Sequence, residues 1–542
     1  MKIIALSATG ILKASFKFLG TTLCISASVF TAGHAQTISG GSLVIGSGAV
    51  ISSNNDLFIQ SGASLDVQGT LILKKNLSNQ NATANSLGTG LIEVSGSTTQ
   101  TISGLNIIAN LTMNNPEGLT VGGNTRLTGA LALTSGRITL GTNNLTLGPA
   151  ATVSGTPSAA NMVVATGTGE LRKEFIATGS FTYPVGDNTS TAEYSPVTLN
   201  FSSGTFGSDA YAGVNLVNAK YPDANITTSY LNRYWKVTQS GITGFACTTT
   251  FTYADADISG TEGDLFCVKA DPVPYITYGA VNAGSNLLTA TGLGSFSTFT
   301  GAMGSHELSL IAFLEGPYNA GSMNTTLRAG GLLPLTQPYN TTPWNYTGTE
   351  TVASIPAGVV DWILIELRQA DQPANATSGT IIKKRAAFIK SDGTIVDTDG
   401  TSAVRFYNSN ITQNLYPVVR HRNHLAIMAA NTVSKTGGVY TYDFSTGIGQ
   451  AYGGGSGYKQ IPGTTPAVYG MVAGDIDQNG SVYVPDYTIW ASNQGTAGVY
   501  YNADLDFDGN VYVPDYTKWA ANQGTSNPIL MPNKPKFVTA VP

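Results

Sequence analysis

Charged residues are scarce in this sequence. Asp, Glu, Lys and Arg make up 11% of the 542 residues, against roughly 25% in ordinary soluble proteins. Histidine occurs four times and cysteine three times. The formal net charge of −5 argues against the basic surface that nucleic-acid binding requires, and the hydrophobic content of 42% argues against a charged disordered chain. The remaining profile is β-rich, since 63 glycines and many small polar residues separate short apolar segments.

Common catalytic motifs are also missing. The sequence has no HExxH zinc motif, no GxSxG nucleophile elbow and no GxxxxGK[ST] phosphate loop. Paired glycosidase carboxylates come together only in three dimensions, so scattered acids do not exclude them. Six such acids are Glu170, Glu174, Glu193, Glu262, Glu315 and Glu350. We expect a protein without enzymatic activity and keep a carbohydrate-active enzyme as the alternative.

Residues 1–35 have the features of a secretory signal peptide. Three lysines and no acid accompany an apolar stretch at 18–30, and small residues precede Gln36, where we expect cleavage. An uncleaved anchor and a lipoprotein attached through Cys24 are the alternatives. No later apolar run approaches the length of about 18 residues that a membrane span needs. We therefore expect a secreted protein, or one attached to the cell surface by other means.

Cleavage would leave two cysteines, Cys247 and Cys267. In an oxidising compartment they could pair, and we favour a disulfide over two buried thiols. Such a bridge would close a loop of about 20 residues and stabilise the fold by roughly 3 kcal/mol.

Short apolar segments recur from residue 36 to about 167. Gly, Asn and Ser separate them, and they lack the period of a helix. A parallel β-solenoid would bury such strands against one another, and a β-sandwich is the alternative. The segments include Leu43-Val44-Ile45, Leu57-Phe58-Ile59, Leu71-Ile72-Leu73, Leu111-Thr112-Met113, Leu131-Ala132-Leu133, Ile138-Thr139-Leu140 and Leu145-Thr146-Leu147.

Two β-sandwich domains are expected to follow the solenoid. In residues 168–303 aromatic residues increase and alternating segments lengthen, and residues 184–188 have the composition of a turn. Residues 304–465 hold further strand-length segments. The glycine-rich stretch at 453–457 predicts a flexible link to a small helical module. That module would span residues 466–526, with a flexible tail at 527–542.

The C-terminal module contains an internal repeat. Residues 474–495 read GDIDQNGSVYVPDYTIWASNQG and residues 503–524 read ADLDFDGNVYVPDYTKWAANQG, with a constant offset of 29 residues. Each copy alternates acids and amides, with glycine at the sixth loop position and aspartate at the twelfth. This is the spacing of an EF-hand loop, in which oxygen atoms from alternate positions surround Ca²⁺. The prolines after each loop suit a first helical turn, so one helix should follow each loop with its Tyr and Trp on one face.

With Asp rather than Glu at the twelfth position and one helix per loop, the repeat resembles a type I dockerin. The resemblance covers about residues 469–524 and implies an EF-hand-like module that binds two Ca²⁺ ions. It also implies a cohesin-like or other surface protein as partner, bound by residues around the helices. One ion would be held by Asp475, Asp477, Asn479, Ser481 and Asp486, and the other by Asp504, Asp506, Asp508, Asn510 and Asp515.

A second resemblance covers most of residues 306–524. The stretches AFLEGPY at 312–318, VDWILIELR at 360–368 and VRHRNHL at 419–425 are similar to large secreted proteins of Bacteroidota that are described as haemagglutinin-like. This resemblance implies a surface protein without implying a mechanism.

Residues Arg420-His421-Arg422-Asn423-His424 form the densest polar cluster outside the repeat. As a strand, the segment would place both arginines and His424 on one face. One interpretation is an anion or sugar site that includes Asp361 or Glu366. We favour the other interpretation, in which the cluster pairs with these acids and braces the domain.

Together these features predict a mainly β, secreted or cell-surface adhesin or structural protein. Its dockerin-like module would bind two calcium ions and dock a protein partner. The alternative is a dockerin-bearing carbohydrate-active enzyme, or a glycan-binding component of a polysaccharide-degrading complex. We expect no nucleic-acid partner and no integral membrane segment after cleavage. Seven aspartates and one lysine lie between residues 474 and 524, so most of the net negative charge belongs to the repeat.

Overall fold

The structure, a computed structural model, describes residues 23–25, 28–30, 35–271, 275–436 and 439–527. The chain divides into an N-terminal unit, residues 1–303, and a C-terminal unit, residues 304–542. Most of the predicted signal peptide, and all of the predicted tail except Asn527, lie outside the described residues. Where the structure describes the chain, no helix combines the length and apolar character needed to cross a membrane.

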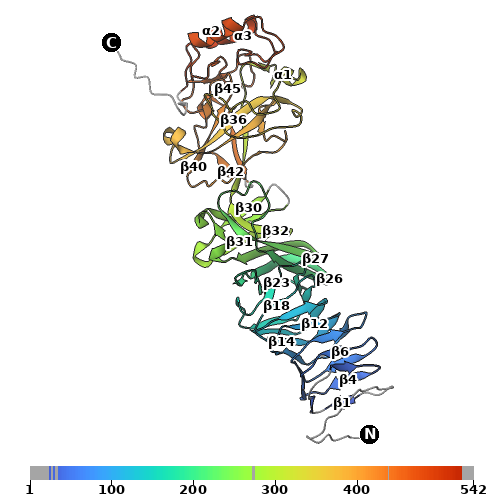
Figure 1. The fold of residues 1–542 in the computed structure, drawn as a ribbon. Helices are drawn as coiled ribbons and strands as arrows, with labels where there is room; N and C mark the ends of the chain where they lie inside the picture. The colour runs from blue at the N-terminus through green and yellow to red at the C-terminus, as the bar shows by residue number, and fades with distance from the viewer. Residues whose placement is uncertain (1–22, 26–27, 31–34, 272–274, 437–438, 528–542) are drawn as a thin grey trace. The chain divides into compact units, whose positions relative to one another are not determined.

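A β-solenoid of about seven turns occupies residues 36–186, and two short strands before residue 36 pair in parallel with its first turn (Figure 1). Three columns of short parallel strands form its faces. The first column contains β1 (Leu23–Ile25), β4 (Ser42–Ile45), β7 (Ser64–Val67), β10 (Asn85–Ser86), β13 (Asn106–Ile108), β16 (Thr125–Leu127), β19 (Leu145–Leu147) and β22 (Leu171–Glu174). The second contains β2 (Ser28–Phe30), β5 (Val50–Ser53), β8 (Thr70–Leu73), β11 (Leu91–Val94), β14 (Asn110–Asn114), β17 (Ala130–Ser135) and β20 (Thr152–Gly155). The third contains β3 (Gln36–Ile38), β6 (Leu57–Ile59), β9 (Leu77–Asn79), β12 (Gln100–Ser103), β15 (Leu119–Gly122), β18 (Ile138–Thr139), β21 (Val163–Val164) and β24 (Val185–Asp187), with β25 (Glu193–Tyr194) antiparallel at the edge.

The predicted apolar segments stack in the core of this solenoid. Leu71 of β8 pairs with Ile92 of β11 in the next turn. Ile92 pairs in turn with Leu111 of β14, and Leu111 pairs with Leu131 of β17. All four are buried, because alternate residues of each strand point into the solenoid. The β-solenoid prediction is confirmed, but its limit at residue 167 is wrong. Strand β24 stacks in parallel on β21, so residues 185–187 form a solenoid strand rather than the predicted turn.

The rest of the N-terminal unit is a curled extension of a solenoid face rather than a separate sandwich. Strand β22 pairs with the long strand β26 (Val197–Val217), which pairs with β27 (Tyr230–Thr252) in one 13-stranded sheet. Irregular register between Phe201 and Tyr211 bends these strands, because bulges increase local twist. The same sheet includes β23 (Gly179–Tyr183), β28 (Ile258–Ser259), β29 (Leu265–Lys269), β30 (Ile276–Ala280), β31 (Leu287–Leu293) and β32 (Thr298–Met303).

The expected disulfide does not form. Cys247 lies in β27 and Cys267 lies in β29, and both are buried free thiols. Each side chain packs in the apolar core of the N-terminal unit.

The C-terminal unit is built on one nine-stranded sheet, which replaces the predicted second sandwich. Its pairs are antiparallel except for β33 with β43. Strand β36 (Val359–Ala370) lies between β40 and β37, and all but one of its residues are buried. The others are β33 (Ser305–Ile311), β37 (Ile381–Lys390), β38 (Thr394–Val396), β39 (Val404–Tyr407), β40 (Asn414–Arg420), β41 (Ile427–Met428), β42 (Ser434–Thr436) and β43 (Val439–Asp443).

Smaller elements complete the described chain. Two hairpins pair β34 (Tyr318–Asn319) with β35 (Ser322–Met323) and β44 (Tyr458–Gln460) with β45 (Tyr469–Met471). The α-helices are α1 (Thr326–Ala329), α2 (Val484–Asn493) and α3 (Val513–Asn522). Short 3-10 turns lie at Asp255–Asp257, Glu262–Asp264, Ala283–Ser285, Pro373–Asn375, Ser378–Thr380 and Ile448–Gln450. Below, the sheet part means residues 304–465 and the repeat module means residues 466–527.

Candidate metal centre

The first repeat loop brings three carboxylates together. Oxygen atoms of Asp475, Asp477 and Asp486 lie within 4.8 Å of one another, which is close enough to share one cation. Asp475 is buried and both its oxygens accept hydrogen bonds from the backbone N–H of Gly480, the glycine at the sixth position. Gly480 has a φ of +84°, a conformation that side chains rarely adopt, so the tight turn needs glycine here.

The second loop also gathers three carboxylates, but in a different combination. Oxygen atoms of Asp504, Asp506 and Asp508 lie within 4.8 Å of one another. One buried oxygen of Asp504, Oδ1, has no hydrogen-bond partner among the described residues. A buried unpaired carboxylate oxygen is costly, and a hard cation with oxygen ligands would satisfy it.

The twelfth-position acids connect each loop to its helix. Asp486 accepts hydrogen bonds from the backbone N–H groups of Ile476 and Asp477, at 2.7 and 3.0 Å, and of Tyr483 at 2.9 Å. Asp515 accepts the equivalent three bonds in the second loop. Both acids stand in the first turn of a helix, where negative charge is favoured. The predicted helix after each loop is therefore confirmed.

The remaining predicted ligands lie on the same loops. The side-chain amide of Asn479 donates to Asp477 Oδ2 over 2.7 Å, and that of Asn510 donates to Asp508 Oδ1 over 3.1 Å. Ser481 forms a β-bridge with Ser526. In an EF-hand loop the seventh residue supplies its backbone carbonyl, so the side chains of Ser481 and Asn510 are free for other contacts.

Burial raises the pKa of several of the loop carboxyl groups, and repulsion between neighbouring carboxylates adds to the effect. Burial raises the pKa of Asp486 to about 6, that of Asp515 to about 6 and that of Asp504 to about 7. The pKa of Asp475 is raised well above its ordinary value by burial and by the neighbouring Asp486 and Asp477. Bringing like charges together in a buried place is unfavourable, and a bound divalent cation would relieve it. The residues present therefore fit a calcium ion in each loop.

The two repeats pack against each other with near two-fold equivalence. The indole N–H of Trp490 donates to the carbonyl of Tyr512, and that of Trp519 donates to the carbonyl of Tyr483, each over 3.1 Å. Both indoles are mostly buried, as the predicted aromatic face of each helix requires. The ring of Tyr487 packs at a tilt against Trp519 of the other repeat, with centroids 5.2 Å apart, and Tyr516 packs in the same way against Trp490, with centroids 5.1 Å apart.

An apolar surface remains exposed at the beginning of the two helices. Equivalent residues of the two repeats have nearly equal exposed fractions, which shows that the surface is symmetric. They are Tyr483 and Tyr512 (44 and 43%), Val484 and Val513 (59 and 60%), and Tyr487 and Tyr516 (39% each). We call these six residues the tyrosine–valine face.

The polar segment 420–424 is buried and structural, as the favoured interpretation predicts. Arg420 Nε donates to Glu366 Oε1 and Arg422 Nε donates to Asp361 Oδ2, both over 2.8 Å. Strand β40 ends at Arg420, so the following residues do not alternate between two faces as a strand would require. Burial lowers the pKa of His421 and of His424, because it disfavours the charged imidazolium form.

The predicted link at 453–457 does not separate the repeat module from the sheet part. Backbone hydrogen bonds join the two parts. The carbonyl of Asn423 accepts from the N–H of Gly474, and the N–H of Leu425 donates to the carbonyl of Val472. Buried Glu315 accepts hydrogen bonds from Lys459, Ala473 and Asn522. Sequence reasoning missed this role of Glu315, although a glutamate in an otherwise apolar segment was a visible signal.

The scattered acids are all engaged in local contacts. Glu170 and Glu174 form ion pairs with Arg172 and Arg126, and Glu193 pairs with Arg233. Glu262 and Glu350 accept hydrogen bonds from Tyr253 and Tyr346, and Glu315 pairs with Lys459. Each of the six acids therefore has at least one side-chain partner, while Oε2 of Glu350 is buried without a hydrogen-bond partner among the described residues.

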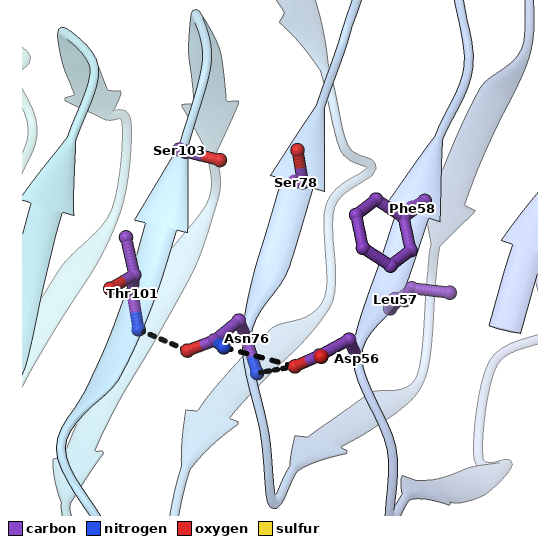
Figure 2. Close-up of a pocket in the computed structure, with 7 residues that line it drawn as sticks. All are labelled: Asp56, Leu57, Phe58, Asn76, Ser78, Thr101 and Ser103. Carbon is purple, nitrogen blue, oxygen red and sulfur yellow. Dashed lines mark hydrogen bonds between the residues drawn. The ribbon is translucent and has the colours of Figure 1, made fainter. Parts of the chain in front are cut away.

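A shallow hollow of about 250 Å³ lies on the outer side of the third solenoid face. Figure 2 shows Asp56, Asn76 and Thr101 in one row across neighbouring strands, with Phe58, Ser78 and Ser103 in the next. Asn76 donates to Asp56 Oδ1 through its backbone and side chain, and Thr101 donates its N–H to Asn76 Oδ1 over 2.7 Å (Figure 2). The hollow therefore combines one aromatic ring with polar groups on the surface of the solenoid.

Comparison of the chain with protein-family models, with curated proteins and with solved structures finds no match. The argument about function therefore depends on the geometry of the two acidic loops and their surroundings.

Proposed function

We propose that this protein is a secreted or cell-surface adhesin or structural protein whose repeat module binds two calcium ions and docks a protein partner. The two groups of convergent carboxylates carry this proposal. Their order along each loop is that of an EF-hand, and the module resembles a dockerin. The predicted ligands are the five residues of each loop named above.

Calorimetry on the whole chain tests the metal sites. Titration of the metal-free protein with CaCl2 should show about two sites per chain. The double variant Asp475→Asn, Asp504→Asn should lose both. Asp209→Asn is the control, since it makes the same kind of substitution once, at an exposed position in the N-terminal unit. Absence of calcium binding by the unmodified chain would refute the proposal.

The tyrosine–valine face supports the docking part of the proposal. It offers six partly exposed apolar or aromatic side chains at the beginning of the two helices, while Asn522 at the end of the second helix donates a hydrogen bond to Glu315 of the sheet part. Aromatic residues are enriched at protein interfaces, and an apolar patch on a polar module is a candidate contact surface. The partner we propose is a cohesin-like or other surface protein.

A comparison of two variants tests this face. Tyr487→Ser with Tyr516→Ser should abolish capture of a single secreted partner by immobilised protein in the presence of calcium. The control is Tyr501→Ser, another exposed tyrosine of the same module outside the face. Equal capture by both variants would show that the partner does not use the tyrosine–valine face.

Glycan binding is a second candidate, which the solenoid hollow favours. The ring of Phe58 could stack on a sugar face while Ser78 and Thr101 hydroxyls and the Asp56 carboxylate receive its hydroxyl groups. Phe58→Ser should weaken binding to a neutral polysaccharide on a glycan array. The control is Ile107→Ser, which changes an outward position of another solenoid face. Release of reducing sugar from a polysaccharide would favour the carbohydrate-active enzyme instead.

A further inference from the structure

The two calcium loops differ in how they meet the sheet part. At the fourth loop position the second loop has Phe507, where the first has Gln478. Phe507 is fully buried and belongs to the apolar core of the sheet part. Gln478 instead turns back on its own loop and donates to the carbonyl of Asp475 over 2.6 Å.

Side chains of the sheet part also donate hydrogen bonds to the backbone of the second loop. Asn423 donates to the carbonyl of Asp504 over 2.8 Å, and Asn324 donates to the carbonyl of Asp506 over 2.7 Å. Both donors belong to the sheet part, and both acceptors are on predicted calcium ligands. The backbone of the second loop is thus fixed from outside the module.

The sixth-position glycines show the same asymmetry. A methyl group added to Gly509 would lie 2.7 Å from Leu332 Cδ1 of the sheet part. At Gly480 nothing lies within 4 Å of the same added atom. The second loop is therefore enclosed at its turn, while the first is open there.

The enclosed loop also touches the buried charges of the sheet part. The ring of Phe507 stacks on His421, with centroids 5.4 Å apart, and lies 4.8 Å from the guanidinium of Arg422. Arg422 and His421 both contact Asp361 in the buried strand β36, which lies between β40 and β37. A chain of packed groups therefore connects the second loop to an interior strand of the sheet.

We infer that the two calcium sites are unequal. The second is a structural site whose ion stabilises the sheet part, and the first is a site whose ion exchanges without disturbing the sheet. This inference rests on the proposed calcium binding and concerns how each ion is coupled to the rest of the chain. Coupling of this kind is reciprocal, so the sheet part must also raise the calcium affinity of the second loop.

Hydrogen–deuterium exchange on the whole chain tests the inference. Asp504→Asn leaves only the first site and Asp475→Asn leaves only the second. With CaCl2 present, Asp504→Asn should accelerate exchange in peptides covering 361–368 and 415–424, while Asp475→Asn should leave them protected. Equal protection in the two variants, or equal loss, would overturn the inference. Failure of the unmodified chain to bind calcium would instead overturn the proposed function.

The reciprocal effect gives an independent measurement. In the Asp475→Asn background, Phe507→Gln should lower the calcium affinity of the second site by at least about fivefold in calorimetry. Gln478→Ala, in the same background, should leave that affinity unchanged. If Phe507→Gln prevents folding, Asn324→Ala removes one contact to the loop at a half-buried position and should lower the affinity in the same direction. Unchanged affinity in a folded variant would overturn the inference.

Discussion

The side-chain amide of Asn423 donates a hydrogen bond to the backbone carbonyl of Asp504 over 2.8 Å, so a residue of the sheet part supports the first ligand of a predicted calcium loop. The same amide donates to the carbonyl of Asn502 over 2.9 Å. The repeat module is therefore built into the C-terminal unit, unlike a domain carried on a flexible link.

The first prediction concerns this amide. Asn423→Asp replaces the donor with a buried charge that faces two carbonyl oxygens. We expect the free energy of unfolding of the C-terminal unit to fall by about 3 kcal/mol or more. Urea denaturation measures the change, with Asn345→Asp as a control at an exposed position. A change no larger than that of the control would contradict the assigned role of Asn423.

Acid should destabilise the C-terminal unit through Glu366. Burial alone would raise the pKa of Glu366, but the guanidinium groups of Arg420 and Arg368 lower it from 4.5 to about 2. Because the pKa in the folded state is below the unfolded value, this stabilisation is complete above pH 4.5 and is lost as the pH falls toward 2. It amounts to roughly 3 kcal/mol.

The variant Glu366→Gln isolates this contribution. It removes the titrating group and leaves Arg368 and Arg420 without their shared carboxylate. We expect a loss of about 3–5 kcal/mol at pH 7 and a shallower fall in stability between pH 4.5 and 2. Denaturation midpoints across this pH range measure both effects. An acid dependence identical to that of the unmodified protein would show that Glu366 does not contribute it.

A buried arginine should stabilise the N-terminal unit by an amount similar to that expected for Glu366 in the C-terminal unit. Arg233 is fully buried and forms ion pairs with Asp187, Glu193 and Asp257. Arg233→Met would leave three acids without their counter-charge and should cost about 3–5 kcal/mol in thermal or urea unfolding. The matched control, Arg172→Met, breaks a partly exposed pair with Glu170 and should cost at most about 1 kcal/mol. Similar losses for the two variants would contradict this ranking.

The two core cysteines should resist thiol reagents. Burial raises the pKa of the Cys247 thiol to about 11 and that of Cys267 further still. Because the thiolate is the reactive form, neither should be alkylated by iodoacetamide at pH 8 in the folded protein. Intact mass should show two alkylated thiols only after unfolding, in protein that lacks residues 1–35. A mass two hydrogen atoms lower, with no alkylation after unfolding, would indicate the disulfide instead.

Local patterns were sufficient to predict the solenoid and the two acidic loops, each followed by a helix. Both features can be recognised within a short stretch of sequence. Examples are the apolar segment Leu71-Ile72-Leu73 and the fixed spacing from Asp475 to Asp486. The solenoid end was missed because Val185 was read with its turn-forming neighbours, although it stacks beside Val163. That pairing joins residues distant in sequence, which local composition does not reveal.

The sheet arrangements were harder to predict for the same reason. Whether β26 joins a solenoid face or forms a separate sandwich depends on its pairing with β22, which is decided by tertiary contacts. The attachment of the repeat module did leave a signal. Phe507 interrupts a polar loop at the position where Gln478 stands in the other copy, and a large apolar residue there indicates a covered loop.

The continuous sheet of the N-terminal unit has a mechanical consequence. Because β19, β22, β26 and β27 are neighbours in one hydrogen-bonded sheet, a pulling force on the solenoid passes directly into the curled sheet. Strands β22 and β26 are hydrogen-bonded directly to each other, so no flexible segment would extend before the sheet is loaded. Tension applied along this unit would load hydrogen-bonded strands from the start, and the force at which the unit yields would be set by the unfolding rate of the sheet.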